Sequence, residues 1–93
     1  DAKLGSIAQL LNENADYRVL IESHTDNRGT DDELNALTQQ RSLAISERLS
    51  GFGIAGSRME AKGFAASIPV APNTTNANRA KNRRVQLILV PTM

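Results

Sequence analysis

The chain has 93 residues, of which 40% are hydrophobic, 23% charged and 3% aromatic; it carries a formal net charge of +1 and contains no cysteine. A chain of this length forms one domain with a limited core, so residues 1–93 are interpreted as a single domain. The lack of cysteine excludes disulfides, thiolate catalysis and Cys-type zinc sites. The small net charge disfavours nucleic acid as a partner. No apolar run approaches the ~20 residues that cross a bilayer, so we expect no direct membrane insertion.

The first two elements are predicted from the spacing of apolar residues. An amphipathic helix is predicted over residues 2–14, because four apolar residues recur there at helical spacing. These residues are Leu4, Ile7, Ala8 and Leu11. A strand is predicted over residues 17–23, where Val19 and Ile21 fall on one face.

A long helix is predicted next. Thr30 and Glu33 match a capping box, in which the hydroxyl and the carboxylate accept hydrogen bonds from free backbone N–H groups. Gly51 and Gly53 mark its end, because glycine tolerates the left-handed turn that commonly terminates a helix. The stripe expected to face the core consists of Leu34, Leu37, Ala44, Ile45, Leu49 and Phe52.

The remaining elements are shorter. A strand is predicted over residues 58–62, a loop over 65–78, a helical turn over 77–82 and a strand over 84–90 that ends at Pro91. This order predicts an α+β fold in which helices pack on one face of a small sheet. The long helix between two strands favours parallel pairing and the later connections permit antiparallel pairing, so a mixed sheet is expected.

Two charged residues are the main candidates for a binding site. Asp26 follows the first strand, where its carboxylate can accept hydrogen bonds from an ammonium ligand or cap its own loop through an Asx-turn. Arg41 interrupts the apolar stripe, so its stem is expected against the buried face and its charge requires a partner. That partner is a ligand carboxylate or Asp26, unless the side chain extends to solvent.

Three further polar residues are weighed in the same way. Arg83 and Arg84 are expected on opposite faces of the last strand, so one of them can join the site. The alternative is a solvated, basic strand end that keeps the sheet edge from pairing with another chain. His24 lacks the partners of a catalytic triad or a zinc site, so a local structural hydrogen bond is expected and catalysis is not. We expect no cofactor and no metal.

Four motifs in chain order resemble those of the OmpA-like domain, the periplasmic peptidoglycan-binding module of outer membrane protein A, peptidoglycan-associated lipoprotein and the flagellar motor protein MotB. The motifs are Ser23-His24-Thr25-Asp26-Asn27-Arg28-Gly29, Leu37-Thr38-Gln39-Gln40-Arg41-Ser42, Gly63-Phe64-Ala65 with Pro69, and Asn78-Arg79 with Asn82-Arg83-Arg84-Val85. The resemblance covers nearly the whole chain.

The resemblance implies non-covalent binding of the peptidoglycan stem peptide through diaminopimelate, in the periplasm, by a domain that anchors a larger protein of the outer membrane or envelope. It implies that Asp26 and Arg41 are the principal contacts. The implied supporting residues are Thr25, Leu37, Thr38, Arg83 and Arg84.

The chain departs from the family pattern at several positions. Leu34 stands where a ligand-facing asparagine is usual, Ser23 replaces a glycine and Ser42 replaces an alanine. The family's first strand is not present before Asp1. One alternative is therefore a degenerate member that serves as a homodimerisation module or binds another envelope protein, and a more distant one is a small hydrolase using His24 and Asp26.

Overall fold

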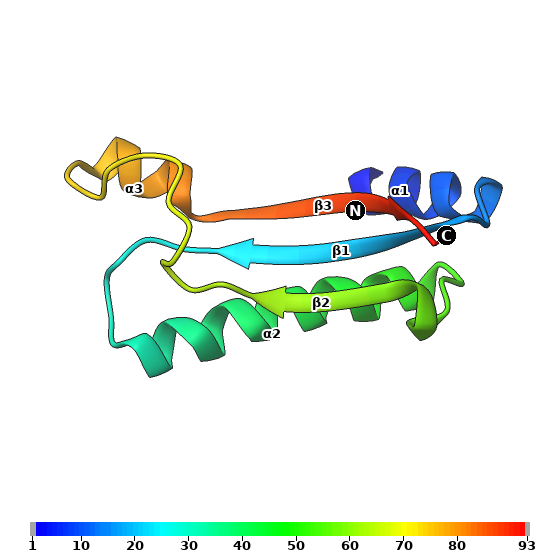
Figure 1. The fold of residues 1–93 in the computed structure, drawn as a ribbon, viewed down its shortest axis with the longest axis horizontal. Coiled ribbons are helices and arrows are strands. Elements are labelled where there is room, and N and C mark those ends of the chain that lie inside the picture. Colours follow the sequence, from blue (N-terminus) through cyan, green and yellow to red (C-terminus); the bar gives the residue numbers. More distant parts are fainter. Residues whose placement is uncertain (1, 93) are drawn as a thin grey trace.

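The computed structural model describes residues 2–92 and contains helices and strands in the predicted order (Figure 1). The elements are α1 (Ala2–Glu13), β1 (Tyr17–His24), α2 (Asp31–Gly51), the 3-10 turn η1 (Gly56–Arg58), β2 (Met59–Gly63), α3 (Asn76–Asn82) and β3 (Arg84–Pro91). No helix within residues 2–92 is long and apolar enough to span a bilayer.

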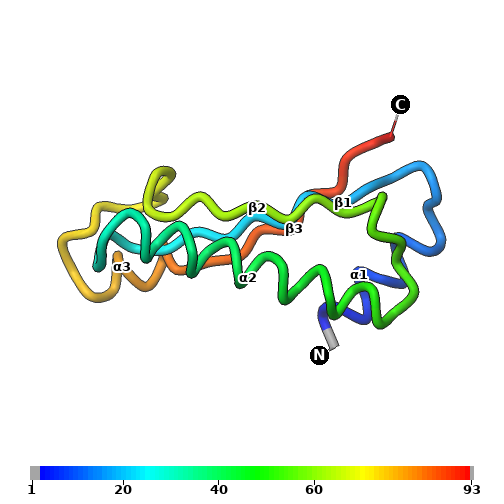
Figure 2. Tube along the Cα trace, turned by 90° about the horizontal axis from the view of Figure 1, so that it is seen from below, coloured from blue at the N-terminus to red at the C-terminus, as the bar shows by residue number. Residues whose placement is uncertain are grey.

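The strands form one sheet in the order β2-β1-β3. β1 pairs with β2 in parallel and with β3 in antiparallel orientation, which confirms the predicted mixed sheet. α1 and α2 lie on the same face of this sheet, as predicted (Figure 2). α3 lies beyond the end of the sheet that is farthest from both termini (Figure 1).

A single apolar cluster lies between these two helices and the sheet. It is formed by Leu4, Ala8, Leu11, Val19, Ile21, Leu49 and Ile54. Val19 and Ile21 belong to it because alternate residues of β1 face the helices, as the sequence predicted. Within residues 2–92 the outer edge of β3 is unpaired, and its Val85 and Leu89 are each 41% exposed.

The buried face of α2 differs from the predicted stripe. Leu37 and Phe52 are 38% and 46% exposed, and Ala44 is also exposed, so the prediction for these residues was wrong. Arg41 is exposed as well, which agrees with the alternative in which its side chain extends to solvent. The buried residues of α2 are instead Leu34, Thr38, Ser42 and Leu49. A stripe counted from apolar residues alone missed this face because two of its members carry hydroxyl groups.

Small residues allow α2 to approach the sheet closely. The Ser42 hydroxyl lies 2.8 Å from the Ser23 hydroxyl and 2.9 Å from the Lys62 carbonyl oxygen, to which it donates a hydrogen bond. At Gly63, a Cβ atom would lie 2.4 Å from the Thr38 Oγ1. Ser23 and Ser42, two of the departures from the family pattern, therefore contact each other inside the fold.

The start of α2 confirms one half of the predicted capping box. The Glu33 backbone N–H donates to the Thr30 hydroxyl at 3.2 Å, as expected. The Glu33 carboxylate accepts a hydrogen bond from that same hydroxyl at 2.9 Å, so the second predicted partner, a backbone N–H group, was wrong. The capped helix end fixes where the loop that carries Asp26 stops.

Candidate functional site

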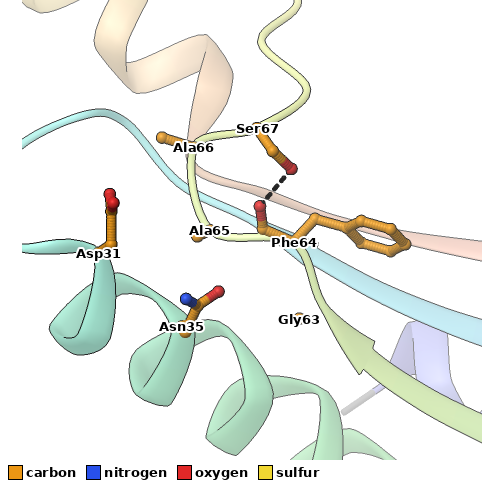
Figure 3. A pocket seen from close by; sticks show the side chains of 7 residues that line it. All are labelled: Asp31, Asn35, Gly63, Phe64, Ala65, Ala66 and Ser67. Carbon is orange, nitrogen blue, oxygen red and sulfur yellow. Dashed lines mark hydrogen bonds between the residues drawn. The ribbon is translucent and has the colours of Figure 1, made fainter.

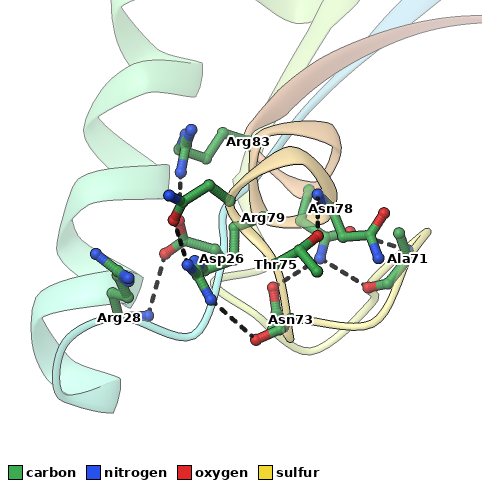
Figure 4. Close-up of polar contacts among 10 residues, drawn as sticks. Asp26, Arg28, Ala71, Asn73, Thr75, Asn78, Arg79 and Arg83 are labelled. Atoms are coloured by element: carbon green, nitrogen blue, oxygen red, sulfur yellow. Dashed lines mark hydrogen bonds and ion pairs between the residues drawn. The ribbon is translucent and has the colours of Figure 1, made fainter.

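Asp26 lies in the loop between β1 and α2, where it is only 4% exposed. Its Oδ1 accepts a hydrogen bond from the Arg28 backbone N–H at 3.1 Å, which is the Asx-turn considered above. Its Oδ2 accepts a hydrogen bond from Arg83 Nη1 at 2.6 Å (Figure 4). Both oxygens of the carboxylate therefore have a donor in the free domain.

This environment favours the ionised form of Asp26. The hydrogen bond from the Arg28 backbone is the largest factor that lowers the pKa of Asp26, burial opposes it, and the Arg83 guanidinium lowers the pKa further. The net direction is downward from 3.8. A full negative charge is thus held in a nearly buried position at neutral pH.

Arg41 is exposed and has neither a hydrogen bond nor an ion pair to Asp26 in the described structure. Its position on α2 follows from Ile45, one turn later, because residues four apart share a helix face. Ile45 lines a groove of about 280 Å³ together with Val85 and Leu87 of β3. Arg41 therefore lies on the β3 side of α2.

The exposed Leu37 precedes Arg41 by one turn and shares this side of α2. The structure thus places Leu37 and Arg41 on one surface.

The two threonines of the predicted site are buried. The Thr25 backbone N–H donates to the Ala65 carbonyl at 2.9 Å, and the Thr38 hydroxyl accepts from the Ala65 N–H at 3.1 Å. Ala65 has a φ of 51°, in the left-handed region that a non-glycine residue adopts only when its surroundings hold it there. Thr25 and Thr38 therefore hold the loop after β2 against the start of α2.

Asn82 is a positioning residue that the sequence reasoning did not identify as part of the site. It is fully buried, and its Oδ1 accepts hydrogen bonds from the backbone N–H groups of Val70 and Ala71 at 2.8 and 3.2 Å. Its Nδ2 donates to the Ala71 carbonyl and to Asn73 Oδ1 at 2.9 and 2.7 Å. This network fixes the chain immediately before Arg83.

Arg83 and Arg84 have different partners, but not as two residues of one strand, because Arg83 is the C-cap of α3 and β3 begins at Arg84. Arg83 reaches Asp26, whereas Arg84 pairs with His24 in the β1–β3 register and donates from Nη2 to the Ile68 carbonyl at 3.0 Å. Of the two arginines, only Arg83 contacts Asp26.

His24 does not make the structural hydrogen bond predicted for it. The side chain is 1% exposed, and neither ring nitrogen has a hydrogen-bond partner within residues 2–92. The ring stacks on Phe64 instead, with centroids 5.1 Å apart and planes 9° apart. The nearest local acceptor, Glu22 Oε1, lies 3.8 Å from His24 Nε2, which is too far for a hydrogen bond, and the stacking partner Phe64 is distant in sequence. The stack joins the end of β1 to the loop after β2.

Stability is expected to fall as the pH drops below 6.5, because burial and then the positive charge of Arg84 lower the pKa of His24 from 6.5, while Glu22 partly opposes this. The unfolded chain binds the proton at higher pH than the folded domain. The neutral His24 ring therefore contributes fully to the stability of the fold above pH 6.5, and this contribution is lost as the pH falls toward the lower pKa of the folded state. The midpoint of thermal unfolding from about pH 8 to about pH 5 checks this. In a His24→Phe variant, which keeps a flat ring on Phe64, the slope should largely disappear; an unchanged slope would contradict the assignment.

A cavity of about 460 Å³ lies next to the loop that follows β2, on the β2 side of α2 (Figure 3). It is lined by Asp31, Asn35, Gly63, Phe64, Ala65, Ala66 and Ser67. None of the seven predicted site residues lines it. Asn35 faces β2 because Gln39, one turn later, donates to the Ala61 carbonyl at 3.2 Å. The cavity is therefore separate from the surface that carries Leu37 and Arg41.

Comparisons with known proteins give a consistent family. The model of the OmpA family matches residues 1–83. Peptidoglycan-binding protein ArfA of Mycobacterium bovis is 35% identical over 86 residues, which are 92% of this chain and 26% of that protein. The peptidoglycan-associated lipoprotein of Buchnera aphidicola is 31% identical over 85 residues, which are 91% of this chain and 49% of that protein. The chain thus spans between a quarter and a half of these relatives.

Solved structures support the same fold. The peptidoglycan-associated lipoprotein of Burkholderia pseudomallei matches with a TM-score of 0.90 and 36% identity, covering 96% of this chain and 75% of that one. The periplasmic domain of Helicobacter pylori MotB matches with a TM-score of 0.84 at 18% identity, which supports the fold alone, over 99% of this chain and 62% of that one. The prediction of an OmpA-like fold is confirmed, and the match to the OmpA family supports the prediction that this domain is not an enzyme.

Proposed function

Since the chain belongs to the OmpA family, we propose that this domain binds peptidoglycan non-covalently and anchors a larger envelope protein to the cell wall. Relatives named as peptidoglycan-binding protein, outer membrane porin and peptidoglycan-associated lipoprotein support this role and an envelope location. We place the domain in the periplasm, where the wall lies. The chain spans 26% of ArfA, so the anchoring of a whole parent protein is part of this proposal.

The proposed ligand group is the free end of diaminopimelate in the stem peptide, which carries one ammonium and one carboxylate. Asp26 binds the ammonium, and the observation that carries this proposal is its ionised carboxylate, 4% exposed and fixed by the Arg28 backbone. A charge that is already in place and shielded from water interacts more strongly than one on a mobile surface side chain.

The carboxylate of the ligand is assigned to Arg41, whose planar guanidinium suits two parallel hydrogen bonds and has no competing acid in the described structure. Leu37, on the same helix side, supplies apolar contact for the methylene chain. Thr25 and Thr38 act by holding the neighbouring loop rather than by touching the ligand. Arg84 supports the end of β3 through the Ile68 carbonyl.

Calorimetric titration with a diaminopimelate stem peptide tests the proposal, with a matched peptide carrying lysine at that position as the comparison. We expect saturable binding of the first peptide and weaker binding of the second, because lysine lacks the carboxylate that Arg41 recognises. Arg41→Ala should lose most of this preference, whereas Arg48→Ala, on an exposed position of the same helix, should retain it. A folded domain that binds neither peptide would contradict wall binding.

The competing function is a protein interaction or dimerisation module, and two observations favour it. Leu34, at the position of the usual asparagine, is 5% exposed and therefore packs inside the domain instead of facing a ligand. Within residues 2–92 the outer edge of β3 has no strand partner, and Val85 and Leu89 of this strand are exposed. Wall binding that survives the loss of Asp26, together with a concentration-dependent dimer in sedimentation, would favour this function.

A further inference from the structure

The ion pair between Asp26 and Arg83 occupies the position at which the ligand ammonium is proposed to bind. Arg83 Nη1 lies 2.6 Å from Asp26 Oδ2, and the other oxygen of the carboxylate accepts from the Arg28 N–H. An incoming ammonium therefore meets an ionised carboxylate that is already paired with a guanidinium. Binding requires an exchange of partners at Asp26.

Arg83 is placed so that this exchange is feasible. Its side chain is 46% exposed, and Asp26 is the one polar partner of its guanidinium within residues 2–92. Its backbone, in contrast, is held by the bond from its N–H to the Arg79 carbonyl at 3.3 Å and by the buried Asn82 before it. The guanidinium can thus leave Asp26 while its attachment point stays fixed.

We propose that Arg83 determines specificity by this exchange, an inference that rests on the proposed function. An ammonium displaces Arg83 from Asp26, and the displaced guanidinium then pairs with the single carboxylate of the same ligand end, which Arg41 also binds. A carboxylate has two oxygens with several lone pairs, so it accepts from both arginines.

The exchange discriminates between two side chains that differ by one carboxylate. A ligand carrying only an ammonium, such as lysine, replaces one ion pair by another and leaves Arg83 without a partner. A ligand carrying both charges replaces one ion pair by two. The internal pair therefore acts against the singly charged ligand, in addition to any attraction for the doubly charged one.

The test is a titration of the wild type and Arg83→Gln with the two stem peptides described above, one with diaminopimelate and one with lysine. In Arg83→Gln, affinity for the lysine peptide should rise, because the competitor is gone, and affinity for the diaminopimelate peptide should fall. The ratio of the two affinities should shrink at least about tenfold. Lys81→Gln removes an exposed positive charge from α3 and should leave the ratio unchanged.

Other outcomes overturn the inference in distinguishable ways. If Arg83→Gln weakens or strengthens both peptides by the same factor, Arg83 is a general charge or a simple competitor and does not determine specificity. If the wild type binds neither peptide, the proposed function fails and the inference fails with it. Thermal unfolding of Arg83→Gln shows whether this variant is still folded. An Arg83→Lys variant keeps the positive charge without the planar guanidinium, so it separates the effect of charge from that of geometry.

Discussion

Asp26→Asn is expected to weaken binding of the diaminopimelate stem peptide by at least about 30-fold, because truncating one partner of a buried charge pair costs about 2 kcal/mol or more. The substitution keeps the size and the acceptor oxygen of the side chain, so the Arg28 N–H retains a partner. What is lost is the negative charge, held in a position that is 4% exposed and so poorly screened by water. Calorimetry at fixed ionic strength measures the change.

The matched control for this substitution is Asp32→Asn. Asp32 is an exposed acid in the first turn of α2, so its replacement changes the net charge by the same amount close to the site. Its affinity should stay close to that of the wild type. An equal loss in both variants would assign the effect to the overall field of the domain, and no loss in Asp26→Asn would remove Asp26 from the site.

Gly63→Ala is expected to lower the free energy of unfolding by about 3 kcal/mol or more, at the upper end of what overpacking costs. The added Cβ would lie 2.4 Å from the Gln39 backbone nitrogen and 2.7 Å from the Thr38 carbonyl carbon. These are backbone atoms in the middle of a helix, so they cannot rotate away as a flexible side chain would. Urea denaturation followed by circular dichroism measures the loss.

Gly56→Ala serves as the control, because a Cβ there meets nothing within 4 Å. Its stability should stay within about 0.5 kcal/mol of the wild type, as is usual for surface substitutions. If Gly63→Ala were as stable as this control, α2 would have to sit farther from β2. The hydrogen bond from the Gly63 N–H to Gln39 Oε1 at 2.9 Å would then have to be longer as well.

The end of β2 and the loop after it contribute both to the stability of the fold and to the position of the proposed binding residue Asp26. Gly63 begins this segment, Phe64 stacks on His24, and Ala65 is held by Thr25 and Thr38. Asp26 follows Thr25 directly, so the backbone that carries the proposed ligand-binding acid is fixed by contacts that contribute to folding. Many of the polar and aromatic contacts around Asp26 therefore have a structural role, which leaves recognition to few side chains.

Local pattern determined a large part of this protein. The elements, their order and the mixed sheet follow from apolar spacing, capping residues and glycines, because those signals act between residues close in sequence. The inward face of β1 was predicted for the same reason, since alternation places Val19 and Ile21 together. Asp26 was located by its place directly after a strand.

Only the tertiary structure decided which surface of α2 is buried. It also decided which groups the charged residues pair with. Thr38 and Ser42 are buried because Gly63 and Ser23 let the helix approach, a complementarity between distant segments that apolar periodicity does not contain. Arg83 lies 57 positions from Asp26 and pairs with it, whereas Arg41 remains exposed. An ion pair forms only between charges that lie within a few ångströms of each other, and for residues distant in sequence that distance is set by tertiary packing.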